Sequence, residues 1–320
     1  MPTFQSVINS IKSPQESAQA RQALIKKIES LTKRRLLVYV ADINKLPASM
    51  LTPEDKTGFS DLIQDVTDTE VDVLINSPGG FAEVTEAIVS MLRSKFDSVR
   101  FAVPNMAKSA ATLLALSGDE LLLDHRSELG PIDPQVEYQS TDGRKREAAE
   151  DILDGFDEAK RTLVKEGPAA IPAYAPLLNK YSLGLLRGCM NAKQLSETLA
   201  IDWLKKYMFK GQARSQKPRQ IARYFASHSK TLSHNRAICI DRCDQLGVKM
   251  VDLREPENGE LDEAIWNLWC VYELHFERAA GMGVYKIYEN SSGCSLQKQR
   301  VEIQIVPGPP QVPQGQRPQK

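Results

Sequence analysis

Short apolar runs alternate with amphipathic segments along the first half of the chain. Each run is five or six residues long and is bounded by turn residues, which is typical of strands buried on both faces. The predicted strands are 35–40, 71–75, 99–103 and 120–124. Apolar residues at helical spacing predict one helix before them, at 14–33, and three between them, around 59–66, at 81–96 and at 110–117. The alternation predicts an α/β fold with a largely parallel sheet and right-handed crossovers.

The second half has a mainly helical pattern. Apolar residues at helical spacing predict helices at 174–187, 191–208, 219–229, 235–246 and 261–275. One further strand is expected within 246–253, and a late hairpin within 283–290 and 298–306. We therefore predict an N-terminal helical segment (1–33), an α/β core (34–170), a mainly helical C-terminal region (171–306) and a disordered Pro/Gln/Gly-rich tail (307–320).

Composition and charge narrow the class of protein. The 320 residues are 42% hydrophobic and 26% charged, which fits a globular chain. Lys plus Arg and Asp plus Glu both number 41, so no global field favours nucleic acid or anionic lipid. Neither a signal peptide nor an apolar run of about 18 residues is present, so we expect a cytoplasmic protein. Five scattered cysteines fit reduced thiols better than disulfides.

Two turns follow predicted strands and have residues suited to chemistry. Asn76-Ser77-Pro78-Gly79-Gly80 lies between a strand and a helix, where glycines let backbone amides approach a ligand or an oxyanion. Ser109 lies at the second such turn, and is either a nucleophile or an ordinary helix cap. Open α/β sheets bind ligands at the carboxyl ends of their strands, which favours a shared site.

These segments together resemble a known family. INSPGG at 75–80, MAKSAATLLALSGDELLLD at 106–124 and LGPIDPQ at 129–135 are similar to the serine dehydrogenase proteinase family of the Clp-protease/crotonase superfamily, which is related to signal peptide peptidase A. The resemblance implies a Clp/crotonase-like ββα superhelix. It also implies that Ser109 is the nucleophile and that Gly79, Gly80 and Ala110 form the oxyanion hole.

The general base is harder to identify. Clp proteases have a histidine near the position of residues 130–133 of this chain, where none occurs, so a Ser-Lys dyad like that of signal peptide peptidase A is expected. A dyad lysine must be desolvated, and Lys160 lies on the apolar stripe of a predicted helix at 148–166. Lys160 is therefore the first choice, with Lys108 and Lys145 as alternatives.

Other polar residues allow a structural and a functional interpretation. Asp133 is a turn former or orients a substrate or partner, and His234 starts a helix or serves a neighbouring subunit. His125 is expected in a surface turn, and the charged segment 143–151 in a solvated loop and helix start. Cys239 and Cys243 lack the spacing of paired metal ligands, so no metal is expected.

The sequence therefore predicts a cofactor-free serine endopeptidase that acts on soluble or membrane-surface polypeptides. By resemblance it forms homo-oligomers. The alternatives are a crotonase-like acyl-CoA enzyme, which also uses paired backbone amides, and a non-catalytic scaffold that retains the fold.

Overall fold

A seven-stranded sheet forms the centre of the molecule. The computed structural model describes residues 3–140, 143–212 and 214–300, and the strand order there is β11-β10-β1-β2-β3-β5-β9. Five strands are parallel: β1 (Arg35–Ala41), β2 (Glu70–Asn76), β3 (Ser98–Ala102), β5 (Glu120–Leu123) and β9 (Met250–Asp252). β10 (Val284–Asn290) and β11 (Ser295–Gln299) add an antiparallel edge. The four strands predicted in the first half are confirmed as β1, β2, β3 and β5.

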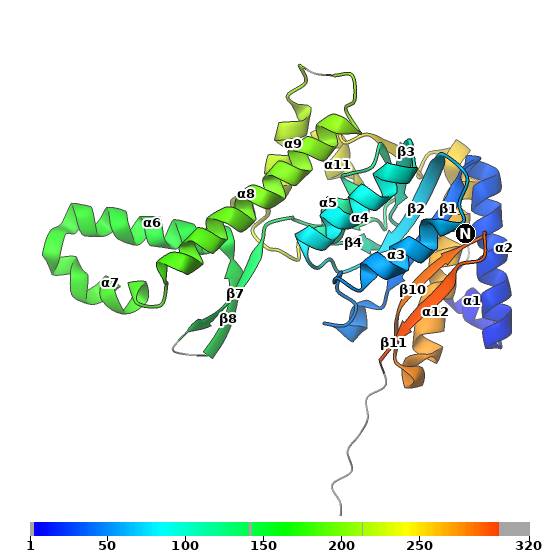
Figure 1. Cartoon of the computed structure of the whole chain (residues 1–320), viewed down its shortest axis with the longest axis horizontal. Helices are drawn as coiled ribbons and strands as arrows, with labels where there is room; N and C mark the ends of the chain where they lie inside the picture. The colour runs from blue at the N-terminus through cyan, green and yellow to red at the C-terminus, as the bar shows by residue number, and fades with distance from the viewer. Residues whose placement is uncertain (1–2, 141–142, 213, 301–320) are drawn as a thin grey trace, which may run out of the picture.

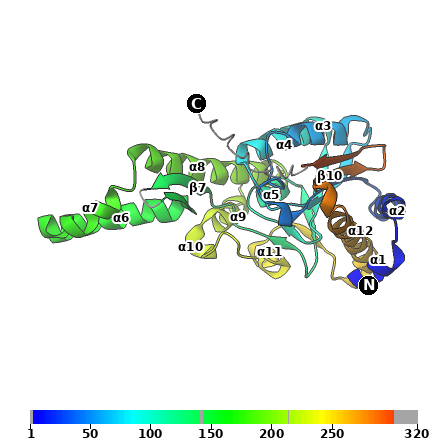
Figure 2. The same ribbon diagram turned by 90° about the horizontal axis from the view of Figure 1, so that it is seen from below.

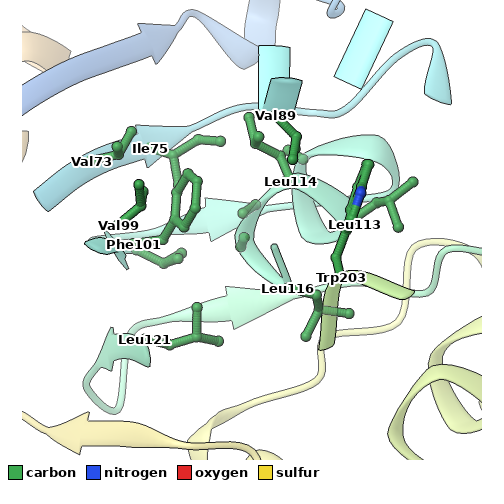
Figure 3. Packing of buried hydrophobic residues seen from close by; sticks show 14 of the residues in the cluster. Val73, Ile75, Val89, Val99, Phe101, Leu113, Leu114, Leu116, Leu121 and Trp203 are labelled. Atoms are coloured by element: carbon green, nitrogen blue, oxygen red, sulfur yellow. The ribbon is translucent and has the colours of Figure 1, made fainter. Parts of the chain in front are cut away.

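Helices cover both faces of this sheet (Figure 1). Successive side chains of a strand point to opposite faces, so alternate residues of β1 enter two separate cores. Leu37 and Tyr39 pack with α3 (Asp55–Gln64), α4 (Ala82–Lys95) and α5 (Ala110–Ala115), whereas Leu36 and Val38 pack with α2 (Pro14–Thr32) and α12 (Gly259–Arg278). Figure 3 shows the first core, where Phe101 of β3 and Leu114 of α5 come together.

Three helices extend away from the sheet as an arm, which consists of α6 (Ala149–Glu166), α7 (Ile171–Leu178) and the first half of α8 (Leu183–Lys206) (Figures 1 and 2). At its base β7 (Gln135–Ser140) and β8 (Gly143–Ala148) form an antiparallel hairpin. The expected loop at 143–148 is therefore wrong, because pairing with β7 satisfies the backbone of this charged segment. The helices predicted at 174–187 and 191–208 are also corrected, since α8 runs without a break from 183 to 206.

The remaining helices and strands are short. They are α1 (Phe4–Ser10), β4 (Met106–Ala107), β6 (Glu128–Leu129), α9 (Lys217–Ala226), α10 (His228–Thr231) and α11 (Ile240–Leu246). The helix predicted at 235–246 begins only at Ile240. The second hairpin strand lies at 295–299, earlier than expected, and the predicted tail at 307–320 lies outside the described residues.

The α/β fold with a helical C-terminal region is confirmed. Strands from both sides of residue 170 share the central sheet, and the expected domain boundaries remain a prediction. Across the described residues, no helix is both long and apolar enough to cross a membrane.

Candidate active site

Ser109 lies at a strained turn between β4 and α5. Its backbone has φ 51° and ψ −121°, a conformation that a residue with a Cβ atom rarely adopts. Such strain persists only where the surroundings enforce it, and it concentrates at functional sites. Thr112, one turn into α5, donates its hydroxyl to the carbonyl of Ala107 and closes the turn from behind. The backbone geometry therefore favours the nucleophile interpretation over an ordinary helix cap, and Ser109 makes no capping hydrogen bond.

The Gly79-Gly80 turn packs directly against Ser109. Gly79 has φ +90°, and a Cβ atom there would lie 2.4 Å from the carbonyl oxygen of Lys108 and 2.8 Å from the Cβ of Ser109. Gly80 is bracketed by Leu51, whose amide donates to the Gly79 carbonyl at 2.7 Å and whose carbonyl accepts from the Phe81 amide at 3.0 Å. Only glycine allows this approach, so the two turns predicted to share a site do so.

The three predicted oxyanion donors differ in their hydrogen bonding. The Gly79 amide donates to the hydroxyl of Ser77 at 3.2 Å. Within the described part of the chain, the amides of Gly80 and Ala110 have no hydrogen-bond acceptor. Two amides on either side of the contact between the turns are thus available to an oxygen atom. Gly79 contributes the close approach of the two turns, and its own amide is occupied.

A pocket of 690 Å³ opens in front of Ser109. Ser109, Ala110 and Gly80 line it together with the aliphatic side chains of Leu113 and Ile132. The β7–β8 hairpin covers another side with alternate residues, which are Gln135, Glu137, Arg144 and Arg146. One histidine, His234, also lines this pocket.

His234 is held by the buried carboxylate of Asp133. Its Nδ1 lies 2.8 Å from Oδ1 of Asp133, whose side chain is 1% exposed. When Nδ1 carries the proton and donates it to this carboxylate, Nε2 is left as an acceptor. Among the described residues Nε2 has no hydrogen-bond partner, and the Ser109 hydroxyl has none either. The two groups share the pocket without a direct bond, and such contacts often tighten only when substrate binds.

Long-range contacts bring His234 to this pocket. Leu129 and Ile238 exchange backbone hydrogen bonds of 3.1 and 2.9 Å, and the Ile132 amide donates to the carbonyl of Phe225 at 2.8 Å. These bonds fix the segment containing Asp133 to the segment containing His234, 101 positions later. Sequence reasoning considered both residues separately and missed their pairing. The hint in the local sequence was that residues 130–133, where Clp proteases have a histidine, contain none.

The predicted lysine bases lie elsewhere. The expectation that Lys160 is buried is wrong, because its side chain is exposed on α6, where the covered stripe includes Ala159. A rise of 1.5 Å per residue puts Lys160 about 16 Å along α6 from Ala149, whose amide is bonded to the pocket residue Pro134. Lys160 is not among the residues that line the pocket.

The two alternative lysines are also turned away from Ser109. Lys108 extends to Glu128, 2.6 Å from its carboxylate, and contacts the carbonyl of Leu129. Lys145 lies on β8 between Arg144 and Arg146, so its side chain points to the face opposite the pocket.

The other candidate positions lie outside the pocket lining. His125 is exposed in a turn, as predicted. Cys239 is exposed and Cys243 buried. Across the described residues, no group of three or more His, Cys, Asp or Glu side chains is arranged to hold a metal ion.

Comparisons with known proteins agree with the sequence resemblance. Two uncharacterised proteins of Methanocaldococcus jannaschii are 31% identical over 119 residues and 36% identical over 69 residues. These alignments cover 36% and 22% of this chain, and 36% and 24% of the relatives, so the chain matches only about a third and a quarter of their lengths.

Solved structures are more distant. A membrane-bound stomatin-specific protease, 1510-N, has 13% identity and a TM-score of 0.39 over 65% of this chain and 76% of its own. ClpP1 from Listeria monocytogenes has 13% identity and a TM-score of 0.36 over 72% of this chain and 95% of its own.

The family model of the ClpP-like SDH-type serine proteinases matches residues 13–153. That stretch contains β1 to β8 and includes both turns of the pocket, with Ser109, Gly80 and Ala110. Residues 13–153 are therefore similar to the ClpP-like SDH-type serine proteinases, in agreement with the resemblance of the sequence motifs.

Proposed function

We propose that the chain is a serine peptidase in which Ser109 is the nucleophile and His234, oriented by Asp133, is the general base. One observation carries the proposal: the strained serine and a carboxylate-bound histidine line the same pocket. A serine hydroxyl is a weak nucleophile at its ordinary pKa and needs such a base. The family match over 13–153 supports the same class of reaction.

The proposed reaction proceeds in two halves. Nε2 of His234 takes the hydroxyl proton as Oγ of Ser109 bonds to the carbonyl carbon of a peptide, and the C=O electron pair moves onto oxygen. The amides of Gly80 and Ala110 donate to that oxyanion. Collapse breaks the C–N bond, and His234 gives its proton to the leaving amine. A water molecule then repeats the sequence and releases the acid.

Asp133 contributes by fixing the ring of His234. Its carboxylate selects the tautomer with the proton on Nδ1 and stabilises the imidazolium that forms during the reaction. Because Asp133 is 1% exposed, little solvent screens this interaction. The Ser-Lys dyad with Lys160 remains a prediction, and the experiment below tests both bases together.

Labelling by a fluorophosphonate, whose fluoride leaves when a reactive serine bonds to phosphorus, separates these assignments. We expect wild-type protein to label and Ser109→Ala not to. Loss of a general base slows such reactions by roughly 100- to 10,000-fold, so His234→Ala should lose most of its rate and Lys160→Ala almost none. If Lys160→Ala loses most of the labelling rate and His234→Ala almost none, Lys160 is the base and the Ser-Lys dyad is correct. A wild-type protein that never labels would contradict the peptidase proposal.

We also propose that the arm mediates assembly into a homo-oligomer. Four large apolar side chains on it are at least half exposed: Val164, Ile171, Leu183 and Met190. Light scattering gives the molar mass of the particle in solution: we expect an oligomer for the wild type and a smaller particle for Leu183→Asp. A monomeric wild type would contradict it.

A further inference from the structure

A second histidine shares the carboxylate that orients His234. Nδ1 of His228 lies 2.9 Å from Oδ2 of Asp133, and the side-chain amide of Gln135 donates to the same oxygen at 2.9 Å. Among the residues that the structure describes, only His234 contacts the other oxygen, Oδ1, at 2.8 Å. We propose that His228 is a positioning residue, which holds Asp133 in the one orientation that presents Oδ1 to His234. This inference rests on the proposed peptidase function.

The ring of His228 is itself held at both nitrogens. Besides the contact with Asp133, Nε2 lies 3.3 Å from the carboxylate of Asp151, in the first turn of α6. The backbone amide of His228 donates to Glu150 at 3.3 Å, and Glu150 is paired with Lys193 of α8 at 2.9 Å. The side chain of His228 is 18% exposed. Asp133, Asp151 and Glu150 are thus the charged groups that face this residue.

This arrangement connects the arm to the catalytic histidine. Glu150 and Asp151 begin α6, and their contacts reach α10 through the backbone and the ring of His228. From His228 the hydrogen bonds continue through Asp133 to His234. Without His228, Oδ2 of Asp133 keeps, among the described residues, only the side-chain amide of Gln135, and a carboxylate that has lost one of its donors turns more freely about its broad terminal torsion. Removing the His228 ring therefore loosens the orientation of His234 while leaving Ser109 and the oxyanion amides untouched.

Charge gives the same variant a second, measurable effect. A donor on Oδ2 neutralises part of the negative charge of Asp133. Without the ring of His228, more of that charge acts on the imidazolium of His234. The midpoint of the pH–rate profile for Ser109 labelling should then rise by roughly 0.5–1 pH unit in His228→Ala. A purely structural loss lowers the amount of active protein and leaves this midpoint in place.

Three variants test the proposal. His228→Ala removes both ring contacts, while His228→Asn puts an amide N–H near the position of Nδ1 and restores the donor to Asp133. We expect labelling to slow by roughly tenfold in the alanine variant, and the asparagine variant to regain most of the rate and the wild-type midpoint. His125→Ala removes an exposed histidine in a turn away from the pocket and is the matched control.

The outcomes distinguish this inference from the proposed function. If the wild type labels, and His228→Ala labels at the same rate and with the same pH midpoint, the positioning role is overturned and the proposed peptidase function stands. The positioning role is also overturned if His228→Asn labels no faster than His228→Ala. Imidazole NMR of the Ser109→Ala protein needs no activity: the Nδ1–H resonance of His234 should move when His228 is also replaced by Ala. If it does not move, the positioning role fails whatever the protein catalyses.

Discussion

Lys286 is buried without exposure to solvent, and its replacement is expected to reduce stability strongly. Its ammonium lies 2.8 Å from the carboxylate of Asp55, and both side chains are 0% exposed. Asp55 also accepts from the hydroxyl of Tyr288 and, at 2.7 Å, from the amide of Thr52. Thr52 follows Leu51, the residue that brackets Gly80. The pair therefore supports the segment that brackets the Gly79-Gly80 turn.

Lys286→Met keeps most of the volume and removes the charge. Breaking a buried ion pair on one side costs about 3–5 kcal/mol, because the remaining charge stays desolvated. Asp55 keeps two donors, Tyr288 and Thr52, so the lower end is expected, about 3 kcal/mol of the free energy of unfolding. Urea denaturation followed by circular dichroism measures this difference.

Two further variants make the test specific. Lys286→Met combined with Asp55→Asn removes both charges. The amide oxygen can still accept from the Thr52 amide, and the amide NH2 can donate to the Tyr288 hydroxyl, so the double variant should recover at least half of the loss. Lys298→Met, on the neighbouring position of β11, is the matched control and should change stability by less than about 1 kcal/mol. A loss below about 1 kcal/mol in Lys286→Met, or a double variant as unstable as the single one, would refute the reasoning.

Two other changes give distinct outcomes. Burial acts to raise the pKa of Glu150, but the Lys193 ammonium and the hydrogen bonds from Ser229 together outweigh it, and the pKa falls to about 2. The stability that this carboxylate contributes is therefore present above about pH 4.5 and is lost as the pH falls toward 2. Glu150→Gln should therefore cost about 1–2 kcal/mol at pH 7, after discounting for the partly exposed lysine, and almost nothing near pH 2.5; thermal melts at both values check this. Gly79→Ala places a methyl group within 2.4 Å of the Lys108 carbonyl oxygen at φ +90°, and it should slow fluorophosphonate labelling at least 100-fold. Gly155→Ala, in open space on α6, is the control and should leave the labelling rate unchanged. Equal labelling rates for the two variants would contradict the packing of the two turns.

Local patterns predicted the sheet and the two turns of the site. The run at 71–75 is buried on both faces, so its composition identifies β2. The β7–β8 hairpin was not predicted, because β8 consists mostly of charged residues and depends on pairing with β7. Turn composition likewise located Ser109 and Gly79, since backbone conformation depends on nearby residues.

The base could not be predicted in the same way. Helical periodicity identifies an apolar stripe on α6, but not how much of that stripe neighbouring elements cover, and Lys160 lies outside the covered part. His234 reaches the pocket through backbone bonds between Leu129 and Ile238, a pairing that no local pattern encodes. Burial of Asp133 between two histidines depends on the same contacts.

Peptide mapping of the fluorophosphonate adduct tests the central claim most directly. The pocket contains two serines, Ser109 and Ser196, and the hydroxyl of Ser196 is buried and donates to the carbonyl of Ile132 at 2.7 Å. The account predicts a single adduct, on Ser109, whose rate of formation falls at least 100-fold in His234→Ala. An adduct on Ser196, or a Ser109 adduct that forms equally fast without His234, would contradict it.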